Sequence, residues 1–422
     1  MNALQTLLCE HKAGACVGVP SVCSAHPLVL EAALQDAGQN DGWVLIEATA
    51  NQVNQFGGYT GMAPAVFRRF MDDLAQRVGV APGRILLGGD HLGPTCWRGQ
   101  GAADAMARSA ALVDAYVAAG FRKLHLDCSM SCADDPAVLS TEVIANRAAD
   151  LCLAAERAWG VAGGEAPVYV IGTEVPTPGG ATEVLDVLEV TTPAAVDETL
   201  TAHRVAFAAR GLDGVWPRVV ALVVQPGVEF DHYKVVDYVP DRARALSTRI
   251  EREEALVYEA HSTDYQTPAA LRCLVRDHFA ILKVGPALTF ALREALWSLS
   301  DIARELTLSP EPSLRQSVLN AMRADPRHWR AYYVDLNRET LDLQYSLSDR
   351  IRYYWNTPSV LRAIEELMSA LERIDIPMTV LSQYLPAQYE AVRAGELEKQ
   401  PRGMILHAIR RVLHQYTLAC RV

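Results

Sequence analysis

Eight short apolar runs, each separated from the next by a segment of helical character, constrain the fold more than any other feature of this sequence. The runs cover residues 16–24, 43–49, 84–91, 122–129, 168–175, 219–227, 255–261 and 279–286. They are continuously apolar, which is typical of strands covered on both faces, and their alternation with helices predicts a parallel sheet. Eight such units favour a closed (β/α)8 barrel, a TIM barrel. The glycine fingerprint expected of an open, doubly wound sheet does not follow the first run.

The strand pattern stops at about residue 300, and the remaining sequence reads as helices. "PSLRQSVLNAMRAD", "VLRAIEELMSALERI" and "GMILHAIRRVLHQY" all carry apolar residues at three- and four-residue spacing. A barrel needs only about 250 residues, and "LSPEPS" at 308–313 has the composition of a boundary loop. We therefore expect a barrel over residues 1–307 and a helical C-terminal extension over 308–422, packed on it.

Charge and cysteine content exclude several classes of protein. The net charge is −11, whereas wholesale binding of nucleic acid or an acidic membrane favours a basic face. The nine cysteines form no CxxC pair, and the first residues lack the basic and apolar regions of a signal peptide. No apolar run approaches the ~20 residues of a membrane span. We expect a cytoplasmic protein that binds neither nucleic acid nor membrane.

Polar side chains gather at the carboxyl ends of the runs, where barrels of this type place their chemistry. In chain order they are Glu47, Asp90, His91, Asp127, Glu174, Gln225, Glu229, Asp231, His232, Glu259, His261 and Lys283. So many carboxylates at one barrel mouth would repel each other and raise each other's pKa. The pattern therefore predicts a bound divalent metal.

Two histidines are the first candidates for metal ligands. His91 and His261 follow the third and seventh runs and would meet at the same rim of the barrel. Imidazole and carboxylate ligands suit Zn²⁺, whose catalytic sites use three protein ligands and keep one position open. We expect His232 as the third ligand, with Glu174 and Glu229 as alternatives. For each residue taken singly, a surface or capping role is the alternative.

Asp90 directly precedes His91, so in a regular strand the two side chains would point to opposite faces. A turn at the following "LGP" would bring both to one site. Asp90 is then a candidate general acid or base, a role that requires hydrogen-bond reach to the substrate. The alternative is a cap, or a partner that orients His91.

Two further segments have the composition of sugar-phosphate contacts. The loop "ATANQVNQFGGYTGMAP" offers the amides of Asn51, Gln52 and Gln55, although it could equally be a self-satisfied loop. "SLSDRIRYYWNTP" contains Arg350 and Arg352, and guanidinium groups suit bidentate phosphate binding; a solvated helix is the alternative. "KVGPALT" opens a helix whose N–H groups could accept an anion.

Several stretches closely resemble the GatZ/KbaZ family, the second subunit of class II D-tagatose-1,6-bisphosphate aldolase. They are "IEATANQVNQFGGYTGM", "GGDHLGP", "VVQPGVEFDH", "YEAHSTDYQT", "LKVGPALTFALREAL" and "SDRIRYYW", spread from about residue 18 to beyond 355. Family members have also been labelled tagatose-6-phosphate kinase, but no Gly-rich nucleotide loop is visible here. The resemblance implies a role in tagatose, galactitol or N-acetylgalactosamine metabolism, beside a separate catalytic aldolase subunit.

The family is in turn similar to the zinc-dependent class II aldolases. That similarity implies an acid/base role for Asp90, metal ligation by His91 and His261, and a catalytic counterpart in Glu174. The sequence departs from the aldolases in two places. "QPGVEFDH" replaces their strand-six metal histidine, and "HSTDYQT" replaces their phosphate loop. The third ligand and the phosphate contacts are therefore not carried over from them.

Two functions remain open at this stage. The chain could be a partner subunit without activity of its own, or, as some relatives are, a stand-alone C4 epimerase of a ketose or ketose phosphate. A metal on the C2 carbonyl and C3 hydroxyl oxygens, with Asp90 accepting the C4 hydroxyl proton, would serve cleavage and epimerisation alike. Candidate substrate-binding residues are Glu47, Asn51, Gln52, Asp127, Gln225, Lys283, Arg350 and Arg352. Whether the chain forms homo-oligomers is left open.

Overall fold

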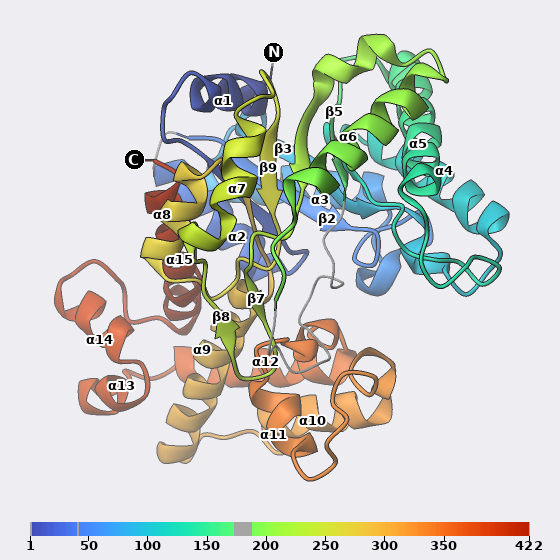
Figure 1. Ribbon diagram of the computed structural model, residues 1–422. Helices are drawn as coiled ribbons and strands as arrows, with labels where there is room; N and C mark the ends of the chain where they lie inside the picture. The colour runs from blue at the N-terminus through green and yellow to red at the C-terminus, as the bar shows by residue number, and fades with distance from the viewer. Residues whose placement is uncertain (1, 40–41, 173–187, 422) are drawn as a thin grey trace.

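A computed structural model describes residues 2–39, 42–172 and 188–421, and it confirms the (β/α)8 barrel. Eight parallel strands close in the order β1-β10-β9-β6-β5-β4-β3-β2 (Figure 1). They are β1 (Val19–Cys23), β2 (Val44–Thr49), β3 (Ile85–Leu92), β4 (Lys123–Leu126), β5 (Val168–Gly172), β6 (Val219–Val223), β9 (Val257–Ala260) and β10 (Phe279–Val284). Each lies within, or within one residue of, one of the eight predicted runs.

Helices surround the barrel and cover the outer face of its strands. They are α2 (Pro27–Gln39), α3 (Pro64–Val78), α4 (Ala102–Ala118), α5 (Thr141–Ala162), α6 (Pro193–Ala208), α7 (Pro240–Ile250), α8 (Pro268–Arg276) and α9 (Pro286–Glu305). A further helix, α1 (Ala3–Lys12), precedes β1 and packs Leu4 and Leu8 with Val19, Leu45 and Leu86 of the strands. The three strand residues are the first or second of their strands, so α1 closes the amino end of the barrel and leaves the carboxyl end open.

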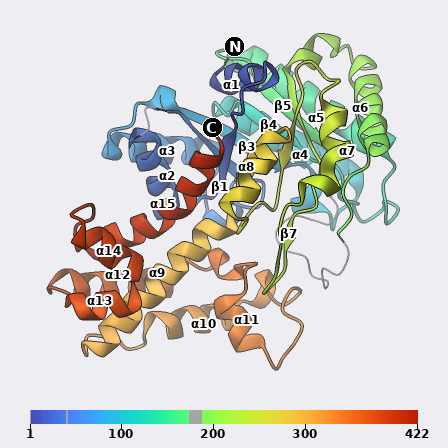
Figure 2. The same cartoon turned by 60° about the vertical axis from the view of Figure 1, so that its left-hand side comes forward.

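The residues beyond α9 form helices, as the sequence predicts. They are α10 (Leu314–Ala324), α11 (Glu339–Tyr345), α12 (Pro358–Glu372), α13 (Met378–Tyr384), α14 (Pro386–Arg393) and α15 (Pro401–Ala419). The long helix α9 runs from the barrel into this extension, while α15 returns to pack against α2, α8 and α9 (Figure 2). The division at residue 307 therefore stays a prediction. None of the helices in the described ranges is long and apolar enough to cross a membrane.

A short hairpin links the barrel to the extension. Its strands, β7 (Glu229–Phe230) and β8 (Val235–Val236), leave the end of β6 and pair antiparallel. The backbone N–H of Leu347 donates to the carbonyl of His232 at the hairpin tip, over 2.9 Å. The hairpin thus holds the extension over the open end of the barrel.

The end of β3 has an irregular backbone that decides where its side chains point. His91 has a φ of +47°, and the pairing of β3 with β4 shifts register between Gly89 and Leu92. This left-handed residue lets Asp90 and His91 face the same site, so the turn lies at His91 itself and not at the "LGP" that follows. Gly93 then packs so tightly that a Cβ atom would lie 1.7 Å from the carbonyl oxygen of Asp127.

A buried carboxyl group joins α9 to the extension. Asp349 is 3% exposed and accepts a hydrogen bond from the Thr289 hydroxyl. Burial raises the pKa of Asp349 to about 7, even though Thr289, Arg352 and Arg293 each favour its charged form. The folded protein therefore holds this carboxyl protonated at a pH where the unfolded chain ionises it.

This shift predicts a pH-dependent effect of Asp349→Asn. The stability contributed by a group with a raised pKa is complete below the unfolded value of about 4 and is lost as the pH rises through about 7. The asparagine keeps the hydrogen-bond acceptor but does not ionise. In urea unfolding, the free energy of unfolding of the variant should exceed that of the wild type by about 1–4 kcal/mol at pH 8. The difference should be smaller at pH 6. The exposed Asp241→Asn serves as control, and parallel pH profiles for all three proteins would contradict the argument.

Candidate functional site

A cavity of about 350 Å³ opens at the carboxyl end of the barrel, beneath the extension. The strand ends contribute polar side chains from β3, β4, β9 and β10, and the extension contributes Tyr332, Arg350, Arg352 and Tyr353. Asn51, Gln52 and Tyr59 of the loop after β2 form part of the wall. The extension and the barrel therefore build this cavity together.

Four side chains at the base of the cavity present their ligand atoms to one another. Atoms of Asp90, His91, His125 and His261 all lie within 4.8 Å of each other, an arrangement that could hold a metal ion. The ring centroids of His91 and His261 are 4.8 Å apart, and His125 lies 4.9 Å from the first and 5.2 Å from the second. The expected meeting of the imidazoles after the third and seventh strands is thus present, and His125 of β4 joins them.

Each of the three rings has an acceptor that fixes one nitrogen. His91 Nδ1 donates to Asp127 Oδ2 over 2.8 Å, and His261 Nε2 donates to Glu259 Oε1 over 3.0 Å. His125 Nε2 lies 2.9 Å from the carbonyl of Gly172, which can only accept. In a neutral ring, the other nitrogen then carries the lone pair; that of His125, Nδ1, also accepts from the backbone N–H of His91 over 3.3 Å.

The contact between His125 Nδ1 and Asp90 Oδ1, at 3.1 Å, follows from this arrangement. When Nε2 of a neutral ring holds the proton, both facing atoms are acceptors and repel. A cation shared by the two atoms would relieve this repulsion. The cluster therefore needs positive charge, part of which Lys283 supplies from 2.7 Å at the same Asp90 Oδ1.

The pKa shifts around the cluster agree with that need. Burial would lower the pKa of His91, but the carboxylates of Asp90 and Asp127 raise it above its ordinary value. Burial would raise the pKa of Asp90, but His91, Lys283 and the hydrogen bond with His125 keep it well below its usual range. Burial lowers the pKa of His261 to about 3, which leaves that ring neutral, as a metal ligand must be.

Below the cluster, two lysines and two glutamates form a buried ring of charges. Lys123 Nζ lies 2.6 Å from both Glu47 and Glu259, and Lys283 Nζ lies 2.9 Å from Glu47 and 3.3 Å from Glu259. Lys283 also reaches Asp90 Oδ1 at 2.7 Å, which connects the ring to the cluster. Gly88 makes room for it, because a Cβ there would lie 2.8 Å from Glu47 Cγ. Glu47 thus belongs to the barrel interior and is not among the residues that line the cavity.

Two other expected ligands, His232 and Glu229, lie away from the cluster. The hairpin carries His232 to the extension, where its ring nitrogens lie 3.0 Å from Ser346 Oγ and from the carbonyl of Tyr332. Glu229 instead accepts from the Phe230 N–H and the Ser262 hydroxyl, and burial raises its pKa to about 7. His232 and Glu229 are therefore outside the described cluster, and Glu174 lies outside the described residues.

Among the expected substrate-binding residues, Asn51, Gln52, Asp127, Lys283, Arg350 and Arg352 line the cavity. Gln225 does not: its side-chain oxygen accepts from the N–H groups of Gly227 and Val228 and closes a turn. The expected anion site at the start of α9 is also occupied by the chain itself. Asp264 Oδ1 accepts from the N–H groups of Gly285 and Ala287, at 3.0 and 2.8 Å.

Sequence reasoning missed His125, although the fourth run contained a signal for it. "RKLHLDCS" places Lys123, His125 and Asp127 at alternate positions of an otherwise apolar strand. Alternate side chains of a barrel strand point to the interior, so three polar residues in that register predict a polar interior at this strand.

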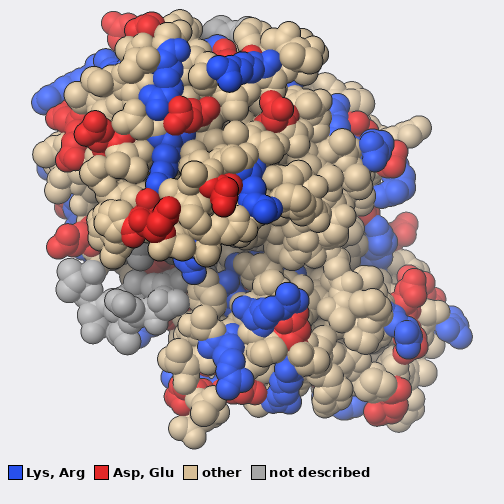
Figure 3. All heavy atoms as spheres, turned by 90° about the vertical axis from the view of Figure 1, so that its right-hand side faces the viewer, with Lys and Arg blue, Asp and Glu red and all other residues tan. Residues whose placement is uncertain are grey.

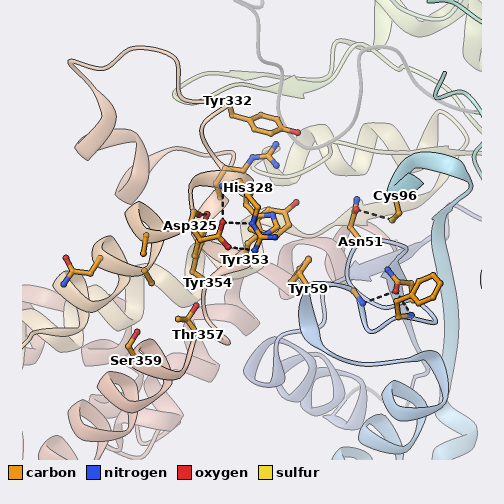
Figure 4. A pocket seen from close by; sticks show the side chains of 18 of the residues that line it. Asn51, Tyr59, Cys96, Asp325, His328, Tyr332, Tyr353, Tyr354, Thr357 and Ser359 are labelled. Atoms are coloured by element: carbon orange, nitrogen blue, oxygen red, sulfur yellow. Dashed lines mark hydrogen bonds and ion pairs between the residues drawn. The ribbon is translucent and has the colours of Figure 1, made fainter. Parts of the chain in front are cut away.

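A wider groove of about 1,100 Å³ adjoins the cavity and shares Asn51, Tyr59 and Arg350 with it. Figure 4 shows Asn51, Tyr59 and Cys96 from the barrel loops facing residues of the extension, among them Tyr332 and Tyr353. In Figure 3 a hollow separates the barrel from the extension, and Lys and Arg side chains gather at its border. A ligand could therefore reach the cavity from solvent along this groove.

The charged ring predicts that Lys123→Met destabilises the fold. The substitution removes the ammonium group from two carboxylates that are fully buried, and an uncompensated buried charge costs about 3–5 kcal/mol. Arg244→Met, which removes an exposed pair with Asp241, should cost about 0–1 kcal/mol. Chemical unfolding of both variants measures the difference in their free energies of unfolding. An equal loss of stability in the two variants would show that the buried ring of charges contributes little.

Comparison with known proteins assigns this chain to a family. The family model for "D-tagatose-1,6-bisphosphate aldolase subunit GatZ/KbaZ-like" matches residues 4–421. A solved structure described as a probable tagatose 6 phosphate kinase from Sinorhizobium meliloti 1021 is 48% identical, with a TM-score of 0.88; the match covers 96% of this chain and 100% of that one.

Two more distant structures are similar at 13–14% identity. One is a putative fructose-1,6-biphosphate aldolase from Coccidioides immitis, with 14% identity, a TM-score of 0.45, and coverage of 87% of this chain and 98% of that one. The other is a fructose-bisphosphate aldolase from Campylobacter jejuni, with 13% identity, a TM-score of 0.48, and coverage of 86% and 95%. The family match alone spans nearly the whole chain, and this protein belongs to the GatZ/KbaZ-like family of D-tagatose-1,6-bisphosphate aldolase subunits.

Proposed function

We propose that the cluster at the barrel mouth is a divalent-metal site held by His91, His125 and His261, with the carboxylate of Asp90 beside it. The observation that carries this proposal is the orientation of the three rings. Each has an acceptor outside the cluster for one ring nitrogen, and the three rings and Asp90 bring ligand atoms within 4.8 Å of one another. Three imidazoles with room for a further ligand suit Zn²⁺.

The reaction we propose is reversible cleavage of the C3–C4 bond of a ketose or ketose phosphate, the bond between the carbon next to the C2 carbonyl and the carbon beyond it. A divalent cation in such a site supplies stabilisation of the negative charge that develops on the carbonyl oxygen. Asp90 accepts the proton of the hydroxyl group on the carbon that becomes an aldehyde. Lys283, 2.7 Å from Asp90, keeps that carboxylate ionised and therefore able to accept.

The same residues serve two outcomes. Release of the aldehyde gives aldol cleavage, and its return with the opposite face exposed gives the C4 epimer. Asn51 and Gln52 face the cavity with amide groups suited to sugar hydroxyls, and Arg350 and Arg352 supply positive charge for a phosphate. Glu174, which follows β5, stays a candidate catalytic residue by its place in the sequence.

A second candidate function is favoured by the family description. In it, the chain is the subunit that assists a separate catalytic aldolase subunit in tagatose-type sugar metabolism. A purely assisting subunit does not require three oriented imidazoles and an ionised carboxylate, so we favour a competent site. A cytoplasmic location stays a prediction, and whether the chain forms homo-oligomers stays open.

Metal content tests the proposed site. After incubation with Zn²⁺ and desalting, the wild type should retain about one equivalent by elemental analysis, and His125→Ala and His261→Ala should retain almost none. Asp127→Asn, which loses the carboxylate that orients His91, should bind about 10- to 100-fold more weakly in a chelator competition. His232→Ala should match the wild type. Retention by His125→Ala together with loss in His232→Ala would refute the assignment.

Activity of the isolated chain separates the two functions. NMR of fructose 6-phosphate or tagatose 6-phosphate incubated with zinc-loaded protein should show conversion, and Asp90→Asn should lower its rate by about 10²–10⁴-fold while keeping the metal. If the isolated wild type is inactive but stimulates an added class II aldolase subunit, the assisting role is correct instead.

A further inference from the structure

A separate groove of about 590 Å³ lies within the C-terminal extension. Among the described residues that line it, none also lines the cavity at the barrel mouth or the wider groove beside that cavity. Helix α9 contributes the largest part of the lining. This helix runs between α13 and α14 on one side and α10 and α11 on the other, as Figure 1 and Figure 2 show. We call this space the α9 groove.

The α9 groove contains a buried arginine. Arg293 lines the groove and is 3% exposed. Its guanidinium carbon lies 4.0 Å from the ring centroid of Phe290 and 5.4 Å from that of Tyr345. Within the described ranges Arg293 forms no hydrogen bond and no ion pair, and its Nε is buried without an acceptor. Aromatic rings offset only part of the cost of burying a charge, so this guanidinium lacks an ionic partner.

The missing partner sets Arg293 apart from other arginines that are largely buried. Three of these are paired with carboxylates: Arg147 with Asp135, Arg218 with Glu156, and Arg249 with Asp197. The charge of Arg293 acts on Glu294 and Asp349, but neither forms an ion pair with it. Glu294 is exposed, and Asp349, with a pKa of about 7, is only partly ionised at neutral pH. The positive charge of Arg293 therefore remains for a ligand.

A second buried donor lies one helical turn further along α9. Trp297 is 2% exposed and lines the same groove, and its indole N–H has no acceptor among the described residues. Arg293 and Trp297 are four residues apart and therefore lie on one face of the helix. Arg315 of α10 places its guanidinium carbon 5.6 Å from a ring centroid of Trp297, and its Nε also lacks an acceptor in the described part of the chain. Three donors without acceptors thus belong to residues that border one space.

The charges of the lining indicate the charge of the ligand. Asp301 is paired with both Arg304 and Arg315 and is therefore neutralised. The described lining contains three arginines and two carboxylates, an excess of one positive charge. One excess charge suits a monoanion, whereas a phosphate dianion would be repelled by Glu294. The planar guanidinium matches a carboxylate, because its N–H groups can bind both oxygens in parallel.

The rest of the lining indicates the body of the ligand. Much of it is aromatic or aliphatic, and it includes Trp297, Tyr345, Tyr384, Leu385 and Val412. The volume of the groove falls within the range of about 300–1,000 Å³ that is usual for small-molecule sites. An organic acid with an apolar or aromatic body therefore fits this lining better than a sugar does.

We propose that the α9 groove binds a small organic monocarboxylate, whose carboxylate lies on Arg293 and whose apolar or aromatic body lies against Trp297 and Tyr345. The site depends neither on the imidazole cluster nor on the reaction proposed above. It can be occupied while the cavity at the barrel mouth also holds a ligand.

Calorimetric titration with benzoate and with its uncharged analogue benzamide tests the proposal. The wild type should bind benzoate about 10- to 100-fold more tightly, because only benzoate offers charge-assisted hydrogen bonds. Arg293→Met should reduce this ratio to near one, and Arg362→Met, which removes an exposed arginine of α12, should leave it unchanged. Without ligand, Arg293→Met should melt at or above the temperature of the wild type, because it removes an unpaired buried charge.

Ala408→Glu tests the same site without changing Arg293. Ala408 of α15 lines the groove and is half-buried, so a glutamate there adds negative charge without disturbing the core. This variant should lower the ratio of benzoate to benzamide affinity by about 3- to 10-fold through repulsion. Ala107→Glu, at an exposed position of α4, is the matched control and should keep the ratio.

The outcomes are distinguishable. Equal affinity of the wild type for benzoate and benzamide overturns the proposal, and water then satisfies the buried donors. If Arg352→Gln lowers the ratio and Arg293→Met does not, the carboxylate binds in the cavity at the barrel mouth and the proposal is wrong. If Arg293→Met does not fold, Ala408→Glu decides: a ratio equal to that of Ala107→Glu overturns the proposal, and a lower one supports it.

Discussion

The buried ring of Glu47, Lys123, Glu259 and Lys283 is the interaction on which the rest of the site depends. Its members come from β2, β4, β9 and β10, so it fixes four strands relative to one another inside the barrel. Burying four charges is favourable only when each has close partners of opposite sign. Lys283 also pairs with Asp90, and this contact favours the ionised form of that carboxylate. Glu259 also accepts from His261 and so orients its imidazole. The buried charges below the cluster therefore help to determine its geometry.

A single local feature then brings the cluster together. The left-handed backbone at His91 and the register shift at the end of β3 turn two consecutive side chains toward one point. Such a conformation costs about 1–3 kcal/mol for a residue with a side chain and persists only where surrounding contacts impose it. At His91, two contacts impose this conformation: the hydrogen bond from its ring to Asp127, and the close packing of Gly93 against the Asp127 backbone. The strain is located where two groups must act on the same substrate.

Much of this could be predicted from the sequence, and the exceptions have physical reasons. The eight runs predict the barrel because burial on both faces makes parallel strands continuously apolar, and strand ends identify Asp90, His91 and His261. His232 was a reasonable third ligand by type and spacing, but a two-stranded hairpin carries it to the extension, and such short pairings leave little pattern in a sequence. His125 lies within a strand and not at its end, so a search restricted to strand ends misses it. An anion site at the start of α9 was expected, but the Asp264 carboxylate accepts the N–H groups there. This contact joins residues far apart in the sequence, so no local pattern encodes it.

The central claim is that three imidazoles, from β3, β4 and the end of β9, meet at one divalent ion. X-ray absorption spectroscopy of the zinc-loaded protein tests it most directly, because imidazole rings give a characteristic multiple-scattering pattern. The account predicts three nitrogen ligands at about 2.0–2.1 Å in the wild type and the same three in His232→Ala. A wild-type spectrum without imidazole scattering, or the loss of one ring from the spectrum in His232→Ala, would contradict it.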